Sequence, residues 1–172
     1  MNLYLRLMFL RLRSRRRTPL GIWDTAVTPF RVTVSDLDLL GHVNNSKYLA
    51  IMDLARIDLM MRSGVWDKLR RQGWYPVVAG QTITYRKSLK LGQRFDVKSR
   101  VLGMDDRWFY VQQVFLHDDA VCAHAVIRVR FLKRGGGNVE HGEMGAFLGG
   151  FPDNLDVPDW VVTWTADTKD AL

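Results

Sequence analysis

The most constraining feature of this sequence is a predicted helix with almost no polar face. Between Tyr48 and Arg62, nonpolar residues occupy most of the helical circumference: Leu49, Ile51, Met52, Leu54, Ala55, Ile57, Leu59, Met60 and Met61. A helix that is hydrophobic on nearly every side is stable only when it is buried. Asn44 or Asn45 supplies a capping side chain before it, and Gly64 follows its end. The rest of the chain must therefore surround this helix.

Strands are the elements available to surround it. Residues 30–34 alternate apolar and polar side chains, and four longer strand candidates follow at 75–87, 94–104, 107–117 and 120–133. The short turn-like connections at 91–93, 105–106 and 118–119 favour hairpins and leave no room for crossover helices. We therefore expect an α+β fold in which an antiparallel meander, within a sheet of about five strands, wraps around one long central helix.

Length and composition indicate one globular domain. The chain has 172 residues, of which 47% are hydrophobic and 25% charged. We expect an N-terminal arm at 1–21 and a single domain at 22–172, with a C-terminal extension from about residue 135, a polar helical turn at 65–72 and a final helix at 158–167. A single cysteine, Cys122, excludes an intrachain disulfide and fits a cytoplasmic location, with peripheral contact at the inner membrane face as an added possibility.

Most of the excess charge lies in the N-terminal arm. Residues 1–17 contain six arginines and no acidic residue, so the net charge of +7 would be +1 without them. This arm is too short and too often interrupted by arginine to span a bilayer, and its charges follow its apolar run, unlike those of a secretory signal. Two alternatives stay open. Leu3, Leu7 and Leu10 form a stripe for an anionic membrane surface, or the arm packs on its own domain or on a partner subunit. Because the charge is confined to the arm, we expect no nucleic-acid binding.

The segment from Ser35 to Tyr48 is the chemically richest part of the chain. It brings carboxylates, an imidazole and amides to the start of the buried helix. Unpaired N–H groups at a helix N-terminus stabilise an oxygen that gains negative charge, as the carbonyl oxygen of a thioester does under attack. The thiolate, whose conjugate acid has a pKa of roughly 8.5, leaves readily. A carboxylate such as Asp38 could attack the carbonyl directly or deprotonate a water that an asparagine orients.

The sequence Asp-Leu-Asp-Leu-Leu-Gly-His-Val-Asn-Asn-Ser-Lys-Tyr at 36–48 resembles the Asp-x-Asp-x-x-x-His-Val-Asn-Asn-x-x-Tyr signature of hotdog-fold thioesterases, which include the 4-hydroxybenzoyl-CoA type. Residues 102–110 are similar to a hairpin of the THEM-type thioesterase-like group. The resemblance covers about residues 28–133 and implies a hotdog fold and an acyl-CoA thioesterase. It implies that Asp38 is the catalytic carboxylate and that the backbone amide of Asn45 polarises the carbonyl.

The resemblance extends to further site residues. His42 matches the plant-type signature, and Asn44 completes the expected catalytic set. Related enzymes carry a histidine at the position of Asn45, so a mechanism through that histidine is not expected here. Asp53 and Asp36 are alternative catalytic carboxylates.

Each of these residues has a structural alternative. Asp38 or Asp36 caps a turn, His42 bridges loop backbone groups, and Asn44 or Asn45 only caps the helix. Asp53 forms a buried salt bridge with Arg56, three residues along the same helix.

The resemblance also implies that a CoA or acyl-carrier-protein thioester is the substrate and that pantetheine enters at a subunit boundary. The histidines match no zinc-binding spacing and the glycine run matches no nucleotide-binding pattern, so we expect no cofactor or metal. A homodimer or a dimer of dimers is the expected assembly, because a second copy would cover the remaining apolar surface. The expected substrate-binding residues are Gly41, Tyr48, Arg86, Lys87, Lys90 and Arg94. Packing is the alternative for Tyr48, and solvated strand ends are the alternative for the basic residues. A non-catalytic module of the same fold that binds acyl-CoA or acyl carrier protein is the alternative function.

Overall fold

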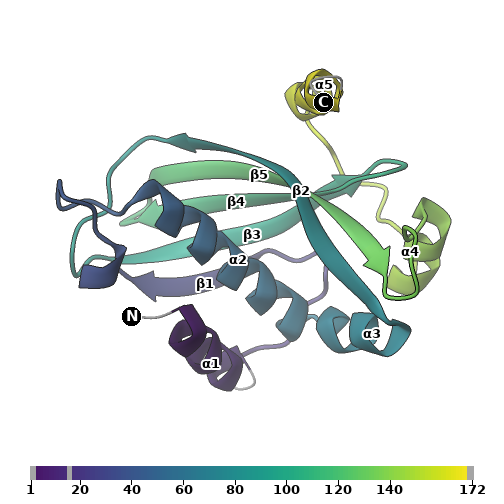
Figure 1. The fold of residues 1–172 in the computed structure, drawn as a ribbon, viewed down its shortest axis with the longest axis horizontal. Coiled ribbons are helices and arrows are strands. Elements are labelled where there is room, and N and C mark those ends of the chain that lie inside the picture. Colours follow the sequence, from purple (N-terminus) through teal and green to yellow (C-terminus); the bar gives the residue numbers. More distant parts are fainter. Residues whose placement is uncertain (1–2, 15–16, 170–172) are drawn as a thin grey trace.

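The computed structural model describes residues 3–14 and 17–169, so residues 1, 2, 15 and 16 of the expected arm lie outside the described part. A five-stranded antiparallel sheet curves around one long helix (Figure 1). The strand order is β1-β3-β4-β5-β2. The elements are β1 (Ala26–Arg31), β2 (Trp74–Tyr85), β3 (Arg94–Met104), β4 (Phe109–His117), β5 (Ala120–Lys133) and the central helix α2 (Asn45–Arg62). The expected α+β fold, with a sheet around a central helix, is confirmed.

Helix α2 is buried against the concave face of the sheet, as its composition predicts. Ile51 and Met52 on the helix and Phe115 and Ile127 on the sheet are at most 1% exposed and belong to one hydrophobic core. Asn44, rather than Asn45, is the N-cap residue, because its Oδ1 accepts the N–H of Ser46 at 2.9 Å. After α2 ends, a second helix, α3 (Val65–Gln72), follows where the sequence predicts a helical turn.

The expected meander is correct only for the last three strands. β3, β4 and β5 are joined by hairpins, and Asp118 and Asp119 form the second turn with φ of 48° and 61°. β2 instead pairs with β5 at the edge of the sheet, for example Tyr85 with Ala123. The linking segment 86–93 can reach β3 because three strand spacings measure only about 14 Å. Leu89, which is fully buried, fixes this crossing to the core.

The first strand begins four residues earlier than predicted. It pairs residues 26–31 with 94–99 of β3 and forms the edge opposite β2. Pro29 interrupts the alternating pattern and shifts the prediction, but an edge strand tolerates proline because its outer N–H groups need no partner within the sheet. The short helix η1 (Val34–Asp36) occupies the place where the strand was expected to end.

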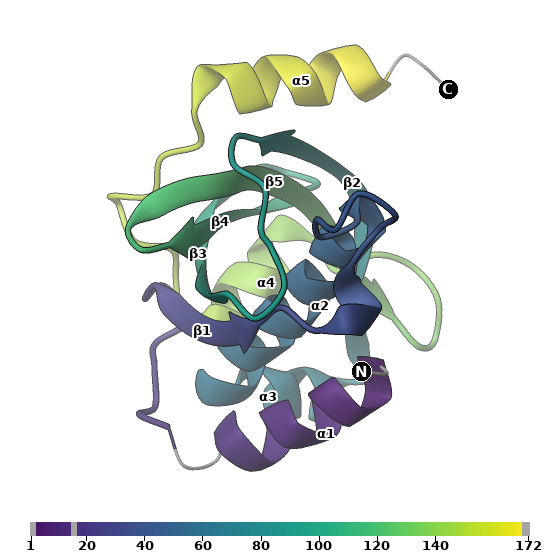
Figure 2. The same cartoon turned by 90° about the vertical axis from the view of Figure 1, so that its left-hand side faces the viewer.

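Two C-terminal helices complete the fold. α4 (His141–Leu148), which the sequence did not predict, packs Phe147 on Trp74 with ring centroids 5.2 Å apart. α5 (Asp159–Lys169) lies on the opposite face of the sheet from α2 (Figure 2). It is held there by Arg128, whose guanidinium lies 4.8 Å from the ring of Trp108 and 5.1 Å from that of Trp164.

The N-terminal helix α1 (Leu3–Ser14) packs on α2, as one of the two open alternatives predicts. Leu10 is buried, and Leu7 is half-buried on the side of the domain. The expected membrane stripe therefore faces inward, although the side chain of its third member, Leu3, lies outside the described part. In the described ranges no helix has the length and apolar content needed to cross a membrane.

Candidate functional site

Asp36, the first carboxylate of the signature segment, is engaged in hydrogen bonds and an ion pair within the protein. Asp36 is buried, and its Oδ2 accepts the N–H and the hydroxyl of Thr33, both at 2.8 Å. The same oxygen forms an ion pair with Arg6 of α1. Asp36 therefore fixes η1 and ties α1 to the loop.

Asp38 has one oxygen that holds a turn and one that remains available. Its Oδ1 accepts the N–H of Leu40 at 2.9 Å and the N–H of His42 at 3.2 Å. Its own N–H donates to the carbonyl of His42 at 2.8 Å. Gly41, with φ of +76°, supplies the left-handed residue that closes this turn. For Oδ2 the described residues provide no hydrogen-bond donor, so this oxygen can bind a water or a substrate.

The loop leads directly into the N-terminus of α2. The N–H of Asn44 donates to the carbonyl of Asp36 at 2.8 Å, and the Asn44 side chain accepts from both the N–H and the hydroxyl of Ser46. Asn45 is exposed and is the first residue of the helix, so its N–H has no acceptor within the helix. The structure thus brings a carboxylate and an uncommitted helix amide to the same end of α2.

Of the four basic residues expected at the site, Lys90 adjoins this loop. His42 forms a β-bridge with Lys90, and the N–H of Val43 donates to the carbonyl of Leu89 at 2.9 Å. Arg86 and Lys87 are exposed in the same linking segment. Their N–H groups donate to the carbonyl of Cys122 on β5, so of these three residues only Lys90 lies directly beside the signature residues.

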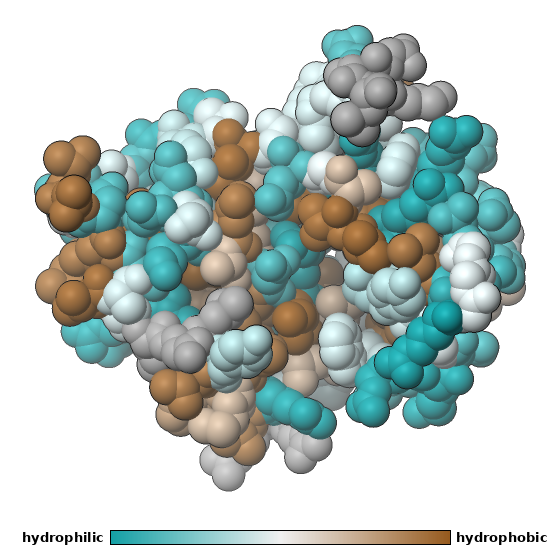
Figure 3. All heavy atoms as spheres, viewed as in Figure 1, coloured by the Kyte–Doolittle hydropathy of each residue, from teal (hydrophilic) through white to brown (hydrophobic). Residues whose placement is uncertain are grey.

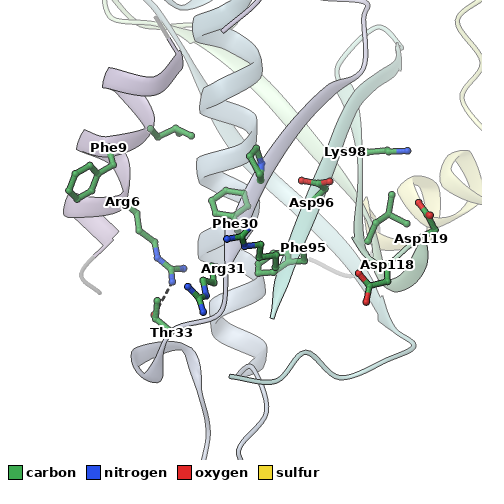
Figure 4. Close-up of a pocket in the computed structure, with 14 residues that line it drawn as sticks. Arg6, Phe9, Phe30, Arg31, Thr33, Phe95, Asp96, Lys98, Asp118 and Asp119 are labelled. Carbon is green, nitrogen blue, oxygen red and sulfur yellow. Dashed lines mark hydrogen bonds between the residues drawn. The ribbon is translucent and has the colours of Figure 1, made fainter. Parts of the chain in front are cut away.

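Arg94, the fourth basic residue, lies elsewhere. It lines a groove of about 850 Å³ between α1 and the first two strands of the sheet, together with Arg6, Phe9, Phe30 and Phe95 (Figure 4). The expected role of Arg94 in substrate binding stays a prediction.

Tyr48 has a packing role in this chain. It is buried, and its ring lies 5.0 Å from the rings of both Tyr85 and Phe115. Burial of the phenol raises the pKa of Tyr48 above its usual value. It orients the first turn of α2 and lies below the surface on which Asn45 is exposed.

Asp53 and Arg56 pair on α2, about 12 Å along the helix from Asn45. Arg56 also donates to Oε1 of Gln113 at 2.8 Å, and Gln113 donates to Ser99 at 2.8 Å and to the carbonyl of Met52 at 3.0 Å. Burial lowers the pKa of Arg56, and the carboxylate of Asp53 opposes that shift. The Asp53 side chain is 57% exposed, so the salt bridge is half-buried instead of buried as predicted.

A cavity of about 440 Å³ with mainly apolar walls opens beside this pair. Asp53 and Arg56 are the charged residues of its lining, and its apolar walls come from α1, α2, α3, α4 and the concave face of the sheet. Sequence reasoning missed it because these walls come from segments far apart in the chain. Asp38 lines neither this cavity nor the larger groove. In the described ranges, no three metal-ligating side chains come together.

Comparison with known proteins adds the family. Residues 32–165 match the family model described as the thioesterase-like superfamily. The chain is 47% identical over 90 residues to Protein THEM6 of Xenopus laevis, covering 51% of this chain and 44% of that protein. It is 33% identical over 114 residues to Protein THEM6 of Danio rerio, covering 66% and 56%. The chain thus spans about half the length of these relatives.

A solved structure shows the same architecture. The probable thioesterase YbaW of Escherichia coli superposes with a TM-score of 0.67 at 24% identity, covering 71% of this chain and 95% of that one. This likeness concerns the fold alone and identifies the arrangement of sheet and central helix as the hotdog fold. With the family match over most of its length, the chain belongs to the thioesterase-like superfamily.

Proposed function

We propose that this protein hydrolyses acyl-CoA or acyl-carrier-protein thioesters, with Asp38 as the catalytic carboxylate. The observation that carries the proposal is that the two oxygens of Asp38 differ. Oδ1 accepts two backbone N–H groups, whereas Oδ2 is available near the end of α2 at which the N–H of Asn45 has no acceptor within the helix. Family membership supports thioester chemistry in general.

The reaction follows from these groups. Oδ2 of Asp38 removes a proton from a water, and the hydroxide attacks the thioester carbonyl carbon. The N–H of Asn45 stabilises the oxyanion of the tetrahedral intermediate. When the carbon–sulfur bond breaks, the thiolate leaves and takes up the proton that Asp38 holds. The products are a carboxylic acid and a free thiol. His42 and Asn44 orient the water, and Arg86, Lys87 and Lys90 attract the CoA phosphates.

A homodimer is part of the proposal, because the site in one chain is open. β2 is an edge strand on which Tyr75, Val77, Val78 and Tyr85 are exposed in the single chain. An edge with such side chains is suited to pairing with another strand. A second copy on β2 would also lie next to the 86–90 segment and would close the site.

Thiol release tests the chemistry. The parent chain and Asp38→Asn are compared on a panel of acyl-CoA esters of increasing chain length, with Asp53→Asn as the matched control. Release by the parent and by Asp53→Asn, with loss in Asp38→Asn, supports the proposal. Loss in Asp53→Asn alone would move the chemistry to the apolar cavity. Retention of acyl-CoA without thiol release from any ester would instead favour a non-catalytic binding module.

A further inference from the structure

Helix α1 presents an apolar face to solvent. Leu5, Met8, Phe9 and Leu12 are 47%, 51%, 55% and 58% exposed. Their spacing of three, four and seven residues places them on one side of the helix. Figure 3 shows hydrophobic side chains gathered at the lower left, where Figure 1 has α1. We call these four residues the outer face of α1.

The inner side of the same helix is already occupied. Arg6, Leu10 and Ser14, which are four residues apart, are buried. Arg6 pairs with Asp36, and just beyond the helix Arg17 donates to the buried Asp58 at 2.7 Å. The helix is therefore anchored to the domain near both of its ends. Its outer face cannot turn inward without breaking these contacts.

The charge near the outer face is positive. Residues 1–17 contain six arginines and no acidic residue. Asp36 and Asp58 neutralise Arg6 and Arg17, whereas Arg11 is exposed at the border of the outer face. Apolar side chains bordered by arginine on an anchored helix fit a surface that is apolar inside and anionic outside.

The signature loop adds a second apolar contact on the same side of the molecule. Leu39 and Leu40, which directly follow Asp38, are exposed. In Figures 1 and 2 the loop and the N-terminal end of α1 lie on the same side, and the ion pair between Arg6 and Asp36 joins them. A flat surface that contacts the outer face would thus lie near the loop.

We propose that the outer face of α1 docks on an anionic lipid bilayer, with Leu39 and Leu40 as the contact nearest the site. Only the consequence of docking rests on the proposed function. If the protein is a thioesterase, docking would bring the loop with Asp38 to the membrane surface, where long acyl thioesters partition. The docking itself needs no catalysis. The outer face differs from the membrane stripe expected from the sequence, because Leu7 and Leu10 of that stripe pack toward the domain.

Vesicle flotation of the full chain tests the docking. The probes are phosphatidylcholine vesicles and phosphatidylcholine vesicles that contain phosphatidylserine. The parent should float with the anionic vesicles and only weakly with the neutral ones. Met8→Ser combined with Leu12→Ser should reduce binding by about tenfold or more, because two apolar side chains no longer enter the lipid. Arg11→Gln should reduce binding to the anionic vesicles alone, by about fivefold.

The matched control is Val121→Ser combined with Val162→Ser, which removes two exposed apolar side chains of β5 and α5. It should float like the parent. Equal flotation of the parent and the α1 variant, equal binding to both kinds of vesicle, or no binding by the parent would overturn the proposal. A parent that is a larger oligomer than the α1 variant in light scattering would also overturn it, because a second copy would then cover the outer face.

Two measurements keep this proposal separate from the hydrolysis. Asp38→Asn should float like the parent, and the α1 variant should release thiol from a short, water-soluble acyl-CoA at the parental rate. A parent that releases thiol but does not float with the anionic vesicles would overturn docking alone. Flotation without thiol release from any ester would leave docking standing and remove the hydrolase.

Discussion

Asp38 and His42 are joined twice, by the N–H of Asp38 donating to the carbonyl of His42 at 2.8 Å and the N–H of His42 donating to Oδ1 of Asp38 at 3.2 Å. This pairing makes the carboxylate a structural part of its turn. It also leaves Oδ2 without a hydrogen-bond donor among the described residues, as the proposed catalytic role requires. The two roles can be separated by substitution.

Asp38→Asn and Asp38→Ala should differ in stability and agree in activity. Asparagine keeps an oxygen that accepts the two N–H groups, whereas alanine removes both hydrogen bonds and should lower the free energy of unfolding by about 1–2 kcal/mol. Both variants should lose thiol release by about 100-fold or more, because neither has a base at this position. Urea unfolding and a thiol assay measure the two effects. Full activity in Asp38→Asn would leave only the turn-capping role.

The ion pair between Arg6 and Asp36 should stabilise the domain measurably. The two side chains are only 8% and 4% exposed, so Arg6→Met leaves a buried carboxylate with fewer donors. We expect the free energy of unfolding to fall by about 3 kcal/mol, as is typical when one partner of a buried pair is removed. Arg11→Met, on the exposed side of the same helix, should change it by less than about 0.5 kcal/mol. A similar small change in both variants would show that α1 is not anchored through Asp36.

Gly103 should not tolerate a side chain. A Cβ at this position would lie 2.7 Å from Cγ2 of Val157, in the segment that leads to α5. Gly103→Ala should therefore lower the free energy of unfolding by about 1–3 kcal/mol. The control is Gly142→Ala in α4, where a Cβ meets no atom within 4 Å and alanine should stabilise the helix by up to about 1 kcal/mol. Thermal unfolding of both variants should show shifts of opposite sign.

Tyr110 should make stability fall at alkaline pH. Burial, together with the hydrogen bond to Asp105, raises the pKa of Tyr110 to about 12. The unfolded chain loses this proton near its ordinary pKa of about 10, so ionisation favours the unfolded state between these values, and stability falls as pH rises through them. Tyr110→Phe should be less stable than the parent at pH 8, and the difference should shrink towards pH 12. A difference that is constant with pH, in melts at increasing pH, would contradict the raised pKa.

The edge strand β2 should carry the dimer contact. Val77→Lys places a charge on this exposed edge and should weaken pairing between copies. Light scattering should give twice the chain mass for the parent and a lower mass for this variant at the same concentration. Val162→Lys on α5 is the control and should leave the mass unchanged. A monomeric parent would remove the homodimer from the proposed function.

The sequence alone determined the central helix, most strand positions and the motif of the site. These properties are local. The apolar circumference at 48–62 requires burial, and alternation of apolar and polar residues defines the strands. The residues from Asp36 to Tyr48 are contiguous, so the motif can be recognised without knowing any long-range contact.

Only the tertiary structure decided which strand pairs with β2, which oxygen of Asp38 is available, which walls form the apolar cavity and which side of α1 faces the domain. Each of these depends on contacts between segments far apart in the chain. Arg6 with Asp36 and Tyr85 with Ala123 are examples, and spacing along the sequence carries no information about such pairs. α1 has apolar residues on both sides, so periodicity could not distinguish its buried side from its outer face. The ion pairs of Arg6 with Asp36 and of Arg17 with Asp58 fix which side of α1 faces the domain.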